Sequence, residues 1–162
     1  MSSSQLLFWL PVIPLIGAFF IGIIPVRMHR LCGSIALLVI LAVTLLTTHF
    51  NSVVLPWHNT VKIETTTATQ NWIPLYDIQA RFSLDGYSGW MILTAAITAF
   101  FAILYAMFTS RQRNRHITIL MILASSIGVF IAKDPMTLLF AWGLWLIVPF
   151  TQASTKNKQH KD

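Results

Sequence analysis

The hydrophobic segments of this chain contain no Asp, Glu, Lys or Arg, although they account for most of its length. Transport of ions or protons through a membrane protein relies on ionisable side chains at membrane depth, and these segments have none. Over the whole chain 10% of residues are charged and 56% are hydrophobic, with a mean hydropathy of +0.69. This composition excludes an ordinary soluble domain and is typical of a multi-pass membrane protein.

Five hydrophobic segments are candidates for membrane-spanning helices, which need about 20 apolar residues to cross a hydrocarbon core about 30 Å thick. They cover residues 6–26, 31–49, 88–108, 117–132 and 135–150. The last two are short, so we expect their ends to extend into the flanking polar sequence. The predicted fold class is an all-α membrane protein, with a transmembrane domain at 1–150, an outer loop at 50–87 and a polar tail at 151–162.

The basic residues predict the orientation of these helices. No Lys or Arg precedes the first segment, and Pro11 and Pro14 interrupt it, so we treat it as a permanent helix and not as a secretory signal. Lys and Arg gather in the short connections that follow segments one, three and five, at positions 27, 30, 111, 113, 115, 156, 158 and 161. Five crossings place all of them on one side. The prediction is an outer N-terminus and an inner C-terminus, in a membrane such as the bacterial inner membrane.

The net charge of +6 is spread over these membrane borders and forms no continuous patch, which argues against nucleic acid as a partner. The single cysteine, Cys32, cannot form an internal disulfide. The histidines, at positions 29, 49, 58, 116 and 160, show no pair at metal-ligand spacing. We therefore expect no metal and no cofactor. A soluble-type enzyme is the weakest class, because no Ser, His and carboxylate are gathered in a cleft and no catalytic residue can be named.

Small residues recur at helical spacing within the hydrophobic segments. One stripe lies on the third segment, and two further pairs have the small-xxx-small spacing that lets helices approach closely. These residues are Ala95, Ala99, Ala102 and Ala106, together with Ala18 and Gly22, and Ala124 and Gly128. They indicate either contacts within one bundle or a docking face for another subunit. Trp142 and Trp145 lie deep in the fifth segment, and we expect them to face protein.

The outer loop contains the longest polar stretch. Residues 64–70, ETTTATQ, read as an exposed loop or a short hairpin. In residues 78–84 apolar and polar side chains alternate, which indicates a short strand leading into the third helix, with Asp85 or Ser88 as its N-cap. The charged residues of this loop are Lys62, Glu64, Asp77, Arg81 and Asp85. We interpret them as surface ion pairs and helix caps.

Two motifs in this chain resemble a known family. Residues 72–88, WIPLYDIQARFSLDGYS, and residues 127–142, IGVFIAKDPMTLLFAW, are similar to the amino-terminal part of the antiporter-like membrane subunit M of the proton-pumping NADH:quinone oxidoreductase, respiratory complex I. The resemblance covers about residues 6–150. The residues that carry it are Trp72, Pro74, Asp85, Gly86, Ser88, Asp134 and Trp142. It implies a proton-translocating assembly with other membrane subunits as partners in the lipid bilayer.

The chain departs from this family at one position that the resemblance marks as essential. The Trp of the fifth helix is followed in the family by a membrane-embedded Glu of the proton channel, whereas here Trp142 is followed by Gly143. No Asp or Glu occurs from 135 to 154 that could replace it. Because glycine can neither exchange a proton nor offset a buried Lys, we expect the proton-channel function to be lost at Gly143.

The family also has longer chains, with two inverted five-helix repeats, of which this sequence covers the first. Three hypotheses remain open. The chain is a truncated, accessory or scaffold subunit of a complex I-like assembly that does not itself conduct protons. Alternatively, it is half of a split proton or sodium antiporter-like subunit whose other helices come from a separate chain. The third hypothesis is a membrane subunit of a related ion-coupled complex, of the inorganic-carbon uptake or hydrogenase type.

Overall fold

The computed structural model describes residues 3–25, 28–54, 66–73, 78–109 and 113–146. In these residues the chain forms five helices and one two-stranded sheet. The helices are α1 (Ser3–Ile23), α2 (His29–Val54), α3 (Gly86–Thr109), α4 (Arg113–Ile131) and an unlabelled fifth helix over Pro135–Leu146. The strands are β1 (Thr66–Ile73) and β2 (Ile78–Leu84).

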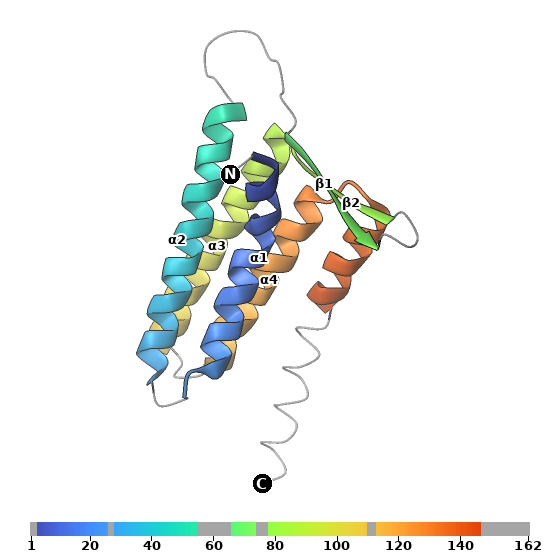
Figure 1. Cartoon of the computed structure of the whole chain (residues 1–162). Coiled ribbons are helices and arrows are strands. Elements are labelled where there is room, and N and C mark those ends of the chain that lie inside the picture. Colours follow the sequence, from blue (N-terminus) through green and yellow to red (C-terminus); the bar gives the residue numbers. More distant parts are fainter. Residues whose placement is uncertain (1–2, 26–27, 55–65, 74–77, 110–112, 147–162) are drawn as a thin grey trace.

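The first four helices form an antiparallel bundle in which α1 packs against α2 and α4, and α3 packs against the same two helices (Figure 1). The hairpin lies at the end of the bundle where α1 and α3 begin and where α2 and α4 end (Figure 1). The fifth helix starts at this same end and runs back alongside α4. Arg30, Arg113 and Arg115 lie at the opposite end, in the first turns of α2 and α4.

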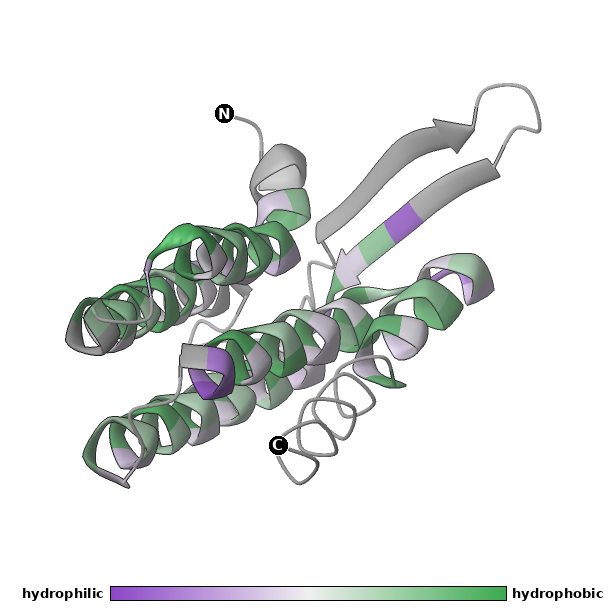
Figure 2. Ribbon diagram, turned by 90° about the horizontal axis from the view of Figure 1, so that it is seen from below, coloured by the Kyte–Doolittle hydropathy of each residue, from purple (hydrophilic) through white to green (hydrophobic). Residues whose placement is uncertain are grey.

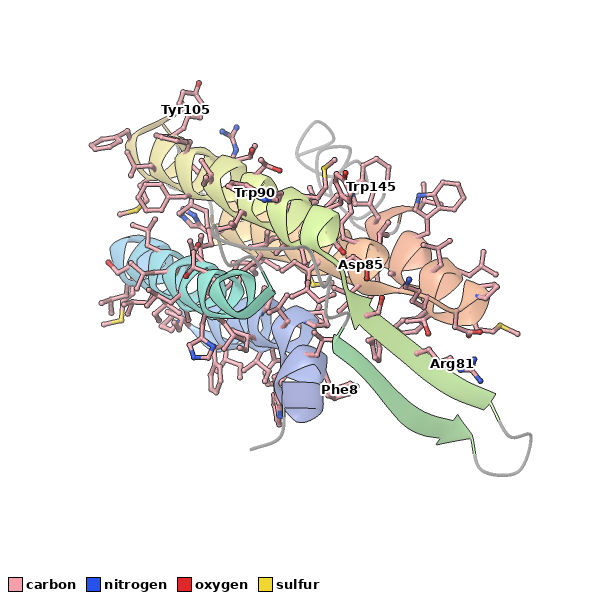
Figure 3. The ribbon with its side chains drawn as sticks, turned by 90° about the horizontal axis from the view of Figure 1, so that it is seen from above. Phe8, Arg81, Asp85, Trp90, Tyr105 and Trp145 are labelled. Carbon is pink, nitrogen blue, oxygen red and sulfur yellow. The ribbon has the colours of Figure 1, made fainter. Side chains whose placement is uncertain are left out.

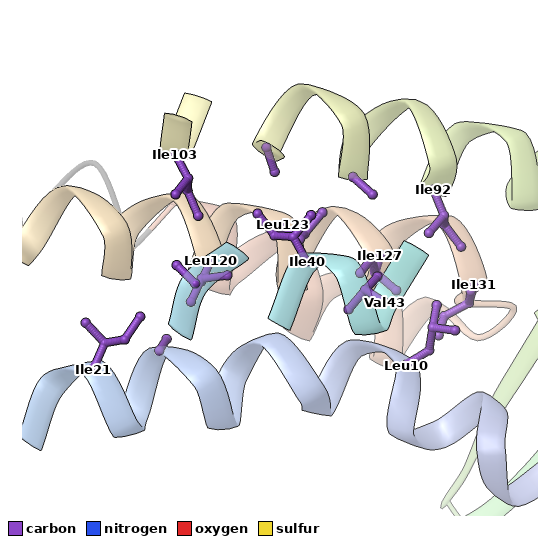
Figure 4. Close-up of a cluster of buried hydrophobic side chains, with 14 of the residues drawn as sticks. Leu10, Ile21, Ile40, Val43, Ile92, Ile103, Leu120, Leu123, Ile127 and Ile131 are labelled. Carbon is purple, nitrogen blue, oxygen red and sulfur yellow. The ribbon is translucent and has the colours of Figure 1, made fainter. Parts of the chain in front are cut away.

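Aliphatic side chains from all four bundle helices fill the core between them. Leu10 and Ile21 of α1 meet residues of α2, α3 and α4 in one continuous cluster (Figure 4). The residues drawn from the other helices include Ile40, Val43, Ile92, Ile103, Leu120, Leu123, Ile127 and Ile131, all of them at most 2% exposed. Close packing of these side chains holds the four helices together by van der Waals contact, which drives the association of apolar helices in lipid.

The outward faces of the helices are also hydrophobic. Figure 2 shows hydrophobic colours around the described helices, with the strongly hydrophilic residues at the start of α4 and in β2. Phe19, Phe101 and Leu139 are among the large apolar side chains that lie at the surface, each at least 60% exposed. A helix that is apolar on all sides belongs inside a large protein core or in a membrane.

Three helical stretches are long and apolar enough to cross a membrane, namely Leu31–His49, Tyr87–Thr109 and Asn114–Ile131. Shorter apolar helical stretches cover Leu7–Ile23 and Pro135–Leu146. These helices indicate a multi-pass membrane protein. As expected for a short segment, α4 starts in polar sequence, at Arg113.

Hydroxyl groups inside these helices bond to the backbone of the preceding turn. The Oγ1 of buried Thr47 donates to the carbonyl of Val43 at 2.8 Å, and the Oγ of buried Ser125 donates to that of Ile122 at 2.9 Å. Thr44, Thr98 and Ser126 bond in the same way. Each bond satisfies a polar group without water, as an apolar environment requires.

Candidate functional site

The most elaborate polar contacts in the described residues lie at the corner where β2 ends, α3 begins and α4 passes into the fifth helix. β2 pairs with β1 in antiparallel register, with Thr69 opposite Arg81 and Thr67 opposite Ser83. Its other edge meets the end of α4, where Phe82 forms an antiparallel bridge with Ala132. The amide of Lys133 donates to the carbonyl of Arg81 at 2.9 Å. This bridge and hydrogen bond tie the end of α4 to the second edge of β2.

Asp85 connects β2 to α3 as the N-cap residue of that helix. Its carbonyl accepts the first helical hydrogen bond, from the amide of Gly89 at 3.0 Å. Its own amide donates to the Oγ of Ser88 at 2.9 Å, and that hydroxyl donates back to the Asp85 carbonyl at 3.2 Å. This is one half of a capping box, in which the third helical residue reaches back to the N-cap amide. The predicted cap is confirmed, with Asp85 as the cap residue and Ser88 as its side-chain partner.

The side chain of Asp85 joins this cap to the α4 junction. Its Oδ2 lies 3.4 Å from the Nζ of Lys133. Both side chains are partly exposed, so solvent screens the pair, and such pairs contribute about 0.2–1 kcal/mol. The other oxygen, Oδ1, is buried, as is the Oγ of Ser83, and neither has a hydrogen-bond partner among the described residues. Figure 3 shows Asp85 at the start of α3 beside the fifth helix, with Arg81 further along β2.

Asp134 is the N-cap residue of the fifth helix, and here the side-chain carboxylate itself forms the cap. Its carbonyl accepts from the amide of Leu138 at 3.0 Å, and its Oδ2 accepts from the amide of Met136 at 3.2 Å. Pro135 occupies the first helical position, where its missing N–H would have no helical partner anyway. Asp134 therefore lies at the turn between α4 and the fifth helix. Of the two Asp residues of the motifs, Asp134 caps its helix with the carboxylate, whereas Asp85 does so through its backbone and Ser88.

The hydrophobic side of the hairpin packs onto the bundle. Phe82 is 5% exposed and meets the ring of Phe8 in α1 edge to face, with centroids 6.0 Å apart. Leu84 is fully buried. The alternation predicted for residues 78–84 is therefore a strand with one face on the bundle, and it positions Asp85 over the end of α4.

The predicted small residues lie mainly inside the chain's own bundle. Ala18, Ala99, Ala106, Ala124 and Gly128 are buried, whereas Ala95 and Ala102 are half-buried. Gly128 faces the fifth helix, because a Cβ added there would lie 3.1 Å from the Cβ of Ala141. Gly22 is exposed, with no atom within 4 Å of an added Cβ. Most of these positions therefore serve contacts within one chain.

Gly143, where the resembling family has its channel Glu, has free space around it. Gly143 lies in the fifth helix, is half-buried, and has no atom within 4 Å of an added Cβ. Trp142 and Trp145, which we expected to face protein, are 58% and 48% exposed, so the described residues leave about half of each side chain uncovered. The labelled Trp145 points away from the bundle in Figure 3. Trp90 is also half exposed, near the start of α3, where an interfacial indole is favoured.

Several predicted positions lie outside the described residues. These are Lys62, Glu64, Pro74, Asp77, His58 and His160, as well as the basic residues 27, 111, 156, 158 and 161. Trp72 lies in β1, and Gly86 is the first residue of α3. In the described ranges no group of three or more His, Cys, Asp or Glu could hold a metal ion.

The sequence did not predict the ion pair of Lys133 with Asp85 or the burial of Ser83. Lys133 directly precedes the cap residue Asp134, which is the only local signal that it lies at an exposed turn. Ser83 alternates with apolar residues and was assigned to a polar face, yet it is 2% exposed. The contact of Lys133 with Asp85 could not be identified from spacing, because it joins segments far apart in the chain.

Comparison of this chain with models of known protein families, and with characterised proteins, finds no match. The resemblance of residues 72–88 and 127–142 to subunit M therefore stays a prediction from the motifs themselves.

Proposed function

We propose that this protein is a non-conducting membrane subunit, with five transmembrane helices, of a complex I-like or related antiporter-derived assembly. The observation that carries the proposal is Gly143, which stands in the fifth helix where the resembling family has its channel Glu. Without that carboxylate the site has no group whose charge can change. Of the carboxylates of the motifs, that of Asp134 caps the fifth helix and that of Asp85 faces Lys133, both at the hairpin end.

We also propose how the bundle is oriented in the membrane. The hairpin end of the bundle faces the outer side, and the ends carrying Arg30, Arg113 and Arg115 face the inner side. Lys133 is a basic residue at the outer end, where Asp85 offsets its charge. The outward-facing part of the fifth helix, including Leu139, Phe140 and Trp142, is apolar and exposed, and suits either lipid or a partner helix.

Co-purification tests membership of an assembly. We expect the tagged protein, extracted from its own membranes in mild detergent, to migrate on a native gel with other membrane subunits that mass spectrometry identifies. Subunits of an NADH dehydrogenase in that band would support the complex I-like assembly. An unrelated ion transporter would instead favour a related ion-coupled complex, and absence of any other subunit would contradict the accessory role.

Proton flux tests the non-conducting character. We expect sealed vesicles containing the purified protein to show no more proton leak than empty vesicles, and Gly143→Glu to leave the flux unchanged. The substituted side chain has space, but the described helices provide no Lys with which it could exchange charge. The matched control is Gly22→Glu, at another open helical position. Flux in the unmodified protein, or flux gained only by Gly143→Glu, would contradict the proposal.

A further inference from the structure

Two side-chain oxygens next to the cap of α3 are buried without a hydrogen bond. They are the Oγ of Ser83 and the Oδ1 of Asp85, and neither has a partner among the described residues. Ser83 is 2% exposed, so bulk solvent does not reach its hydroxyl. A buried polar group that lacks a hydrogen bond destabilises a protein, and a charged one does so more strongly. These two oxygens therefore require a partner that the side chains around them do not supply.

Ser83 and Asp85 lie on the same side of β2. Side chains alternate along a strand, and Phe82 and Leu84 occupy the side that packs on the bundle. Ser83 takes the other side together with Asp85, which directly follows the strand, and Figure 3 shows Asp85 where β2 runs into α3. Residues two apart in a strand are separated by about 6.8 Å along the chain, and these two side chains do not bond to each other directly. Polar groups at such a separation are commonly bridged by a water molecule.

We propose that one water molecule binds between Ser83 and Asp85 and joins them. It donates one hydrogen to Oδ1, which as a carboxylate oxygen only accepts, and it shares a second hydrogen bond with the Ser83 hydroxyl, which both donates and accepts. Two hydrogen bonds of about 2.8 Å each bridge up to about 5.6 Å, which suits side chains two residues apart on one side of a strand. The first amides of α3 lack an acceptor within the helix and lie next to Asp85, so they offer the water a further donor.

The local charge favours water over a metal cation at this place. The other oxygen of Asp85, Oδ2, lies 3.4 Å from the Nζ of Lys133, which already offsets the charge of the carboxylate. Arg81 lies on the same side of the strand, and its exposed side chain adds a second positive charge nearby. A cation would be repelled by both and would have two side-chain oxygens as ligands, whereas a Ca²⁺ ion takes about six to eight oxygens.

The water gives the Asp85 carboxylate a partner on each oxygen and connects three segments of the chain. Lys133, after α4, pairs with Oδ2, and the water ties Oδ1 to Ser83 in β2. The backbone of Asp85 meanwhile begins α3, where its carbonyl accepts from Gly89. This arrangement also assigns a role to Ser83, a polar residue that is buried where the alternation of the strand predicts an exposed one.

Locating the water tests the proposal directly. We expect a crystal structure of the whole chain in lipid, at a resolution that shows ordered water, to contain one density peak about 2.6–3.2 Å from both oxygens. The peak should be lost in Ser83→Ala, which removes one of its partners. No peak in the unmodified protein, a direct hydrogen bond between Ser83 and Asp85, or a peak with several contacts of about 2.4 Å, as for a cation, would each overturn the proposal.

A double-mutant cycle tests the connection by stability in detergent. We expect Ser83→Ala to lower the ratio of folded to unfolded protein by about fivefold, and by less than about twofold when Asp85→Ala is also present, because the water has then lost its carboxylate. The matched control is Ser126→Ala, whose hydroxyl donates to the Ile122 carbonyl of its own helix at 2.8 Å. The effect of the control should be the same with and without Asp85→Ala.

The salt in this cycle separates a bound water from a bound cation. The loss caused by Ser83→Ala should be equal in sodium chloride and in choline chloride at the same ionic strength, since a water molecule needs no particular ion. Losses that simply add in the cycle, or a loss that appears only with sodium, would contradict the bridging water. Both experiments concern a single chain, so their results do not depend on which subunits co-purify, and the proposed function is tested separately.

Discussion

Phe82→Ala is expected to detach the hairpin from the bundle and to expose the amide of Lys133 to solvent. Phe82 is 5% exposed and packs on Phe8, so truncation leaves a cavity between β2 and α1. Such changes cost about 3–5 kcal/mol. The measurement is hydrogen exchange of the Lys133 amide, which bonds to the Arg81 carbonyl. Each 1.4 kcal/mol is about tenfold, so exchange should be faster by roughly two to three and a half orders of magnitude.

Arg81→Ala is the matched control for this experiment. Arg81 precedes Phe82 on the same strand, but its side chain is exposed and its carbonyl, which accepts from Lys133, is unchanged. We expect exchange at Lys133 to stay within about twofold of the unmodified protein, as for most surface substitutions. Similar exchange in both variants would mean that Phe82 does not hold the hairpin in place.

Gly17→Ala is expected to destabilise the bundle by about 1–3 kcal/mol, the usual cost of overpacking a filled core. A Cβ at Gly17 would lie 2.7 Å from Cγ2 of Val39, a side chain that is stiff at χ1 and cannot move aside easily. The helices α1 and α2 would have to separate. The measurement is the midpoint of thermal or denaturant unfolding in detergent, followed by helical circular dichroism.

Gly22→Ala, on the same helix, is expected to raise the stability of the bundle instead of lowering it. No atom lies within 4 Å of a Cβ at Gly22, so the substitution adds no clash and gains helix propensity of about 0.5–1 kcal/mol. Gly33→Ala should be intermediate, because its Cβ would meet the flexible side chain of Met107 at 2.7 Å. Loss of stability in Gly22→Ala as large as in Gly17→Ala would show that the clash with Val39 does not explain the effect.

Sequence reasoning was most successful for features that depend on neighbouring residues. The five hydrophobic segments, the strand before α3 and the cap at Asp85 follow from periodicity, composition and short-range hydrogen bonds. The small-residue pattern also predicted close helix contacts, and Gly128 makes one with Ala141. It did not distinguish the buried Ala18 from the exposed Gly22, although both belong to the same spacing.

The amino-acid sequence by itself determined that the chain forms apolar helices, where they begin, and that no carboxylate follows Trp142. Hydrophobic periodicity and capping act over a few residues and can be read locally. The tertiary structure alone decided that Lys133 meets Asp85, that Gly17 rather than Gly22 contacts α2, and that Trp142 faces outward. These outcomes depend on how apolar helices rotate and pair, and a helix that is apolar on all sides has no sequence stripe to reveal its buried face.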